Sequence, residues 1–163
     1  MSEVMADINI ENFYQHIGKI LSILYELFPT KAPVYVDDVA GIDEPDEYGL
    51  HSPHYTAGFF ALVWLADEGY IRYSDAIRQD GIDQAALTHN AFLRLTRLSD
   101  PIYVPPVYKV DESNLVRIAP AGEPSPSVIE DQKLVINQLR NALRSGDSIA
   151  INKVVLHILQ DHS

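Results

Sequence analysis

The chain contains no cysteine among its 163 residues. This absence excludes disulfide bonds, thiol nucleophiles and cysteine-ligated zinc or iron–sulfur sites. The sequence also has no apolar run near the roughly 20 residues that a membrane span needs. Its N-terminal stretch carries acids where a signal peptide needs positive charge. We therefore expect a cytoplasmic protein without membrane contact.

Basic residues are also scarce. The sequence has 12 Lys and Arg against 23 Asp and Glu, a net charge of −11. A protein that binds duplex nucleic acid usually needs a basic face, because it must displace counterions from the phosphates. The charge therefore argues against DNA binding, although a local basic patch can coexist with an acidic remainder.

Hydrophobic residues make up 47% of the chain, which is ample for a core. The most informative stretch runs from Ser52 to Leu98 and reads as helix, ribbon, helix. Ser52 is a good N-cap with Pro53 behind it, and Gly69 follows the last helical turn. These signals predict a helix over residues 53–68.

A two-stranded ribbon and a short helix are predicted to follow. Residues 70–73 and 84–87 are β-prone, and Asp80-Gly81 between them provides a turn that tolerates positive φ. Thr88 then caps a helix whose apolar residues recur every three positions, at Phe92, Leu95 and Leu98.

Before this stretch, apolar spacing predicts an amphipathic helix over about residues 7–28. A short strand at 34–36 and a brief helix at 38–40, capped by Asp37, come next. Residues 37–48 carry six acids and no base. We interpret them as a solvated loop, with a protein-contact or cation-binding role as the alternative.

After the stretch from Ser52 to Leu98, residues 99–126 hold six of the ten prolines, which predicts a Pro-rich arm. Residues 127–163 read as a helical hairpin, because Ser127 and Glu130 fit a capping box and Gly146 separates two helices. The first of them, to Ser145, carries an apolar stripe of Val128, Val135, Leu139 and Ala142; Asp147 or Ser148 caps the second. Two such helices must dock on the main body or on another subunit.

The order of these elements resembles the winged-helix variant of the helix-turn-helix fold over about residues 10–98. Leu-Ala-Asp-Glu-Gly-Tyr-Ile-Arg at 65–72 looks like the passage from recognition helix into wing. Ala-Leu-Thr-His-Asn-Ala-Phe at 86–92 is similar to bacterial regulators of the MarR and PadR type. The resemblance implies a mainly α fold with a small β-ribbon (α+β), a winged-helix domain at 7–98, and a recognition helix within 52–68 that reads DNA.

The predicted recognition helix departs from that family where DNA would be read. At 100° per residue, Tyr55, Phe59, Leu62, Val63 and Ala66 form its buried face, which turns outward His54, Ala57, Ala61, Trp64 and Glu68. None of the outward residues is Arg or Lys, the usual readers of bases. We therefore interpret His54, Ala57, Ala61 and Trp64 as a protein-contact surface, covered either by another protein or by the C-terminal hairpin of the same chain.

Four arginines support the alternative interpretation, in which the protein contacts DNA. Arg72 and Arg78 on the predicted wing, with Arg94 and Arg97 after it, could touch a DNA backbone or lie free in solvent.

Sequence motifs for catalysis are absent. We find no phosphate loop, no nucleophile elbow and no framed carboxylate pair. His51 and His54 near the acidic loop are the one cluster of metal-ligand type, but Pro53 lies between them and their spacing does not suit a helical zinc site. We expect no enzyme activity, no cofactor and no metal.

The sequence thus predicts a non-catalytic winged-helix adaptor or accessory module that forms a homodimer and binds an unknown protein partner. The alternative is a DNA-binding transcriptional regulator that uses the wing and the recognition helix.

Overall fold

The computed structural model describes residues 2–105 and 126–160. Within these ranges it contains seven helices and a small antiparallel sheet of four strands, which confirms the expected α+β class. Most of the predicted Pro-rich arm, residues 106–125, and the last three residues of the predicted hairpin lie outside the described residues.

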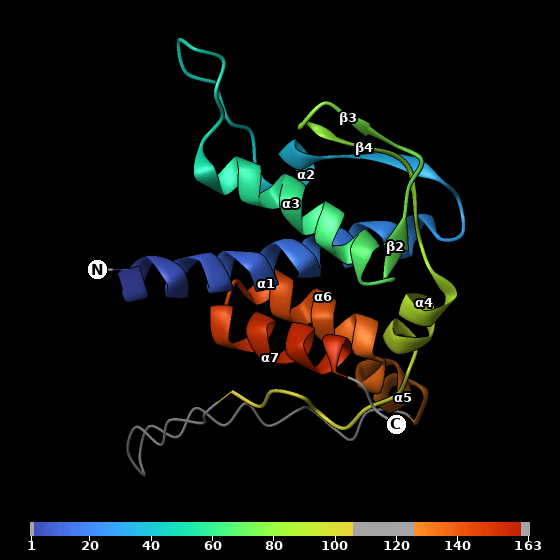
Figure 1. The fold of residues 1–163 in the computed structure, drawn as a ribbon. Helices are drawn as coiled ribbons and strands as arrows, with labels where there is room; N and C mark the ends of the chain where they lie inside the picture. Colours follow the sequence, from blue (N-terminus) through green and yellow to red (C-terminus); the bar gives the residue numbers. More distant parts are fainter. Residues whose placement is uncertain (1, 106–125, 161–163) are drawn as a thin grey trace.

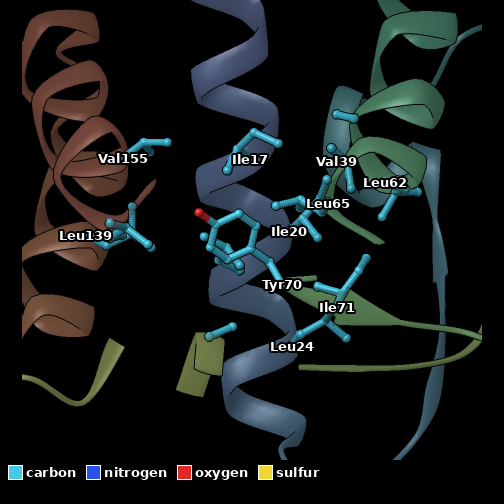
Figure 2. Packing of buried hydrophobic residues seen from close by; sticks show 14 of the residues in the cluster. Ile17, Ile20, Leu24, Val39, Leu62, Leu65, Tyr70, Ile71, Leu139 and Val155 are labelled. Carbon is cyan, nitrogen blue, oxygen red and sulfur yellow. The ribbon is translucent and has the colours of Figure 1, made fainter. Parts of the chain in front are cut away.

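The long first helix, α1 (Ser2–Leu27), is the central element of the fold (Figure 1). It begins earlier than the apolar spacing predicts. Its residues Ile17, Ile20 and Leu24 are fully buried. Figure 2 shows α1 between Leu139 and Val155 on one side and Leu62 and Leu65 on the other. Two groups of elements thus pack against opposite sides of α1.

On the first face of α1 lie β1 (Ala32–Tyr35), α2 (Val36–Ala40) and α3 (Pro53–Asp67). They are followed by β2 (Ile71–Arg72), β3 (Asp75–Ile77), β4 (Gly81–Leu87) and α4 (His89–Leu95). The predicted caps are confirmed for two of these helices, since Ser52 Oγ accepts from the Tyr55 amide and Thr88 Oγ1 from the Ala91 amide, each at 3.3 Å. The predicted Asp37 cap is wrong, because α2 begins at Val36, two residues earlier than predicted, and Tyr35 occupies the N-cap position.

Strand β4 is the centre of the sheet. It pairs with β1 along one edge and, along the other, first with β3 and then with β2. Gln84, with φ of 52°, lies between the segments that pair with β3 and β2. The expected ribbon is therefore present in a larger sheet, in which β1 is the added strand.

The predicted turn at Asp80-Gly81 is displaced. Positive φ occurs at Arg78, at 51°, and the Asp80 amide donates to the Ile77 carbonyl oxygen at 2.9 Å. Gly81 is needed for another reason, because a Cβ there would lie 2.5 Å from the carbonyl oxygen of Val34 on β1. The glycine lets two strands approach closely.

On the second face of α1 lie α6 (Val135–Ser145) and α7 (Ser148–Leu159), joined by Gly146 in the left-handed conformation. A Cβ at Gly18 of α1 would approach side chains of both helices at 3.2–3.3 Å. The predicted hairpin thus docks on the body of its own chain. Of the two predicted caps for its second helix, Asp147 is the N-cap of α7.

The predicted single helix over 127–145 is wrong. It is divided into α5 (Pro126–Lys133) and α6, because Leu134 is extended and forms a β-bridge with Leu98. Hydrogen bonds at 2.8 and 2.9 Å, from the Ser99 amide to Lys133 and from the Val135 amide to Arg97, flank that bridge. Ser127 therefore lies inside α5 and not at a cap, and Val128, expected on the buried stripe, is exposed.

Candidate functional site

Helix α3 exposes an apolar face to solvent. Its outer face, spaced at three- and four-residue steps, consists of the exposed Pro53, Phe60 and Asp67 and the half-buried Ala57 and Trp64. Phe60 is 54% exposed and lies in the middle of the helix. The helix contains no Lys or Arg. This surface offers apolar contact and no group that would grip a phosphate.

The sequence pattern predicted an outer face rotated from this one by about 60°, or a sixth of a turn. Ala61 is only 3% exposed, so the expectation that it faces outward is wrong. Of the other residues predicted to face outward, Ala57 is half-buried and His54 is exposed. Phe60 was missed because α3 is apolar on every side, so its composition does not fix which side faces the core. The buried arc is wide because α1 and α2 both pack on this helix.

Trp64 is half-buried by residues of its own chain. Its ring meets the Phe13 ring of α1 edge-on, with centroids 4.9 Å apart, and lies over Tyr70 at 6.3 Å. The aromatic contacts of Trp64 thus come from α1 and from the start of the ribbon. Phe60 lies four residues before Trp64, one turn away on the same side of α3.

The four predicted DNA-contact arginines fall into two groups. Arg72 on β2, Arg78 in the β3–β4 turn and Arg97 after α4 are exposed. Arg94 instead donates from Nη1 to the carbonyl oxygens of Ile158 and Gln160, both at 2.7 Å, and lies over the Tyr70 ring. It ties α4 to the end of α7, which is a structural use of its charge.

The loop between α2 and α3, residues 41–52, projects from the body of the protein (Figure 1). Its base is held by Asp43, whose Oδ2 accepts from the Ser52 amide at 2.9 Å and lies 3.0 Å from His51 Nδ1. On its other side, His51 Nε2 lies 3.5 Å from Asp80, and the imidazole stacks on Tyr55 at 3.8 Å. The loop is thereby attached to both α3 and the β3–β4 turn.

These contacts alter the acidity of the cluster. The Ser52 amide, and after it the His51 ring, hold the pKa of Asp43 below its usual value. Burial, followed by the nearby Asp80 carboxylate, raises the pKa of Tyr55 to about 12. Tyr55 therefore stays protonated and donates to Asp80 Oδ1 at 3.2 Å. Asp43 remains an anion that accepts hydrogen bonds, so the cluster acts as a clamp for the loop.

The tip of the loop is organised by Asp46. Its Oδ1 accepts from the amides of Tyr48 and Leu50, each at 2.9 Å, and its own amide donates to the Leu50 carbonyl oxygen at 2.8 Å. This is a local turn in which a carboxylate replaces backbone partners. The loop therefore has a defined shape at both its base and its tip.

A cavity of about 440 Å³ lies between residues 101–105 and the helices α6 and α7. Two of the polar side chains that line it already serve the fold. Gln138 Oε1 accepts from the Ile102 amide at 2.8 Å, and Asp147 caps α7. Across the described ranges, no group of three His, Asp or Glu side chains is placed to hold a metal ion. None of the helices described there is long and apolar enough to cross a membrane.

Comparison of the chain with family models, curated proteins and solved structures gives no match.

Proposed function

We propose that this chain is a winged-helix protein whose recognition helix, α3, serves protein contact instead of DNA reading. The order α1, β1, α2, α3, followed by a ribbon whose central strand pairs with β1, supports the winged-helix assignment. In that scheme β3 and β4 form the wing. The fold alone does not decide the function, because winged helices serve several purposes.

The exposure of Phe60 carries the proposal. A half-exposed phenylalanine in the middle of a helix, one turn from the half-buried Trp64, favours a contact with another protein surface. The absence of basic residues from α3 and from residues 37–52, which precede it, disfavours a phosphate backbone as that partner. The protein acts by binding, and a homodimer through the outer face of α3 is part of the proposal.

The test replaces Phe60 with a photo-crosslinking phenylalanine analogue, which keeps an aromatic ring at the site. The matched control places the same analogue at Leu93 of α4, which is 49% exposed. We expect irradiation in the producing cell to give a discrete protein adduct from position 60 and none from position 93. An adduct of twice the chain mass would identify the homodimer.

The proposal would be refuted if the analogue at position 60 gave no protein adduct, or if both positions gave the same adducts. An adduct with DNA would favour the second candidate function, a transcriptional regulator. That candidate rests on the exposed Arg72 and Arg78, which lie beside β3 where a wing would meet a phosphate backbone.

A further inference from the structure

The α2–α3 loop holds three of the four most exposed large apolar side chains among the residues whose exposure the structure describes. Ile42 is 90% exposed, Tyr48 79% and Leu50 65%; Val104, in the arm, is the one other described residue in this range. Single exposed apolar residues are common on protein surfaces, but here three lie within nine residues of one loop, and we call Ile42, Tyr48 and Leu50 the apolar patch of the loop. Such a patch is the usual mark of a contact site.

The hydrogen bonds of the loop keep these side chains outside the core. Asp46 fixes the turn that carries Tyr48 and Leu50, and the clamp of Asp43 and His51 fixes the base. A loop held in this way presents its apolar groups with little further ordering when a partner arrives. Preorganisation of this kind raises affinity because the entropy cost of ordering the loop is already met.

The charge around the patch selects the partner. Glu44, Asp46 and Glu47 are exposed in the loop, and Asp37 and Asp38 are exposed on neighbouring α2. Residues 37–52 contain no Lys or Arg. A second copy of this chain, with its net charge of −11, would bring like charge to this surface. The complementary occupant is a cationic one.

We propose that the α2–α3 loop is a docking element for a protein segment that combines Lys or Arg with apolar side chains. The apolar groups of the segment would cover Ile42, Tyr48 and Leu50, while its cations would face the surrounding carboxylates. This inference rests on the proposed function, since it assigns a partner class to a protein-contact module. It adds a second contact surface beside the outer face of α3.

The experiment selects random peptides displayed on phage against the full chain, and measures the affinity of the enriched peptides by fluorescence anisotropy. The apolar variant carries Ile42→Ser, Tyr48→Ser and Leu50→Ser together. The charge variant carries Glu44→Gln and Glu47→Gln, which leaves the structural Asp43 and Asp46 intact. The matched control is Val104→Ser, an exposed apolar residue outside the loop. Circular dichroism checks that all variants keep their helices.

We expect the enriched peptides to contain Lys or Arg together with apolar residues. The apolar variant should bind them at least about tenfold more weakly, whereas Val104→Ser should bind them like the wild type. The charge variant should lose affinity at about 50 mM salt, with the difference from wild type shrinking as salt rises.

The loop assignment would be overturned if no peptide were enriched, if enriched peptides lacked cations, or if the apolar variant bound them as well as the wild type. Its failure is distinguishable from that of the proposed function. A protein adduct from position 60 together with unaffected peptide binding in the loop variants would leave α3 as the contact surface and remove the loop.

Discussion

At the scale of single residues, His16 is the least expected feature. It is buried on α1, and neither of its ring nitrogens has a hydrogen-bond partner among the described residues. The ring of His54 lies 4.8 Å away, centroid to centroid. Burial, followed by the charges of His54 and Lys19, lowers the pKa of His16 from 6.5 to about 4. His16 therefore stays neutral in the folded protein well below the pH at which it ionises when unfolded.

This difference makes a prediction for stability against pH. Between pH 6.5 and 4 the unfolded chain takes up a proton at His16 and the folded chain does not, so the free energy of unfolding falls as pH falls. The slope is about 1.4 kcal/mol per pH unit, or roughly 3 kcal/mol over the range at most. Above pH 6.5 the contribution is constant. Urea unfolding at several pH values measures it.

The control is a comparison of variants, because carboxylates titrate in the same range. His16→Leu should have a flatter pH dependence than the wild type, and His89→Gln, which changes an exposed histidine at the start of α4, should not. Equal slopes for wild type and His16→Leu would contradict the assignment.

At the scale of the elements, the two packing faces of α1 are joined by side chains of Arg94 in α4 and of Tyr70, just before β2, which reach the end of α7. Arg94 donates to the carbonyl oxygens of Ile158 and Gln160, and the Tyr70 hydroxyl donates to that of Leu159 at 3.1 Å. The last carbonyl groups of a helix have no partners within it, and a cation at that end also interacts favourably with the negative end of the helix dipole.

We therefore predict that Arg94→Ala destabilises the protein by about 2 kcal/mol, the usual range for hydrogen bonds made by a charged group. The amides in the last turn of α7 should lose hydrogen-exchange protection first. Arg97→Ala is the matched control, because Arg97 is exposed, and it should stay within about 0.5 kcal/mol of the wild type. Similar losses in both variants would argue against a specific role for Arg94.

Local signals in the sequence predicted the boundaries of several elements and missed what distant residues decide. Ser52, Thr88 and Asp147 act on amides within three residues, so their caps could be predicted. Leu134 interrupts a helical pattern because it pairs with Leu98, which no local rule reveals. The clamp at His51 likewise requires Asp80, which is close only after the sheet has formed.

At the scale of the whole molecule, the excess of acids sets the expected response to DNA. The net charge is −11, and the ribbon that carries the exposed Arg72 and Arg78 also carries Asp75 and Asp83. We predict no measurable binding to mixed duplex fragments at about 50 mM salt, where even non-specific binders show electrostatic affinity. A titration followed by anisotropy checks this.

Binding that weakens as salt rises would restore the regulator as the function. In that case Arg78→Ala should weaken affinity for all sequences alike and reduce the salt slope by about one unit. The same substitution without effect would remove the wing from the contact.

The position of α1 also has a consequence for how the chain reaches this fold. The face of α1 that carries Gly18 is covered by α6 and α7, which are synthesised more than a hundred residues later. Contacts between segments so far apart slow folding, because a long loop must close first. During synthesis the face stays uncovered until α7 leaves the ribosome, so the nascent chain is most prone to aggregate, or to bind a chaperone, in that interval.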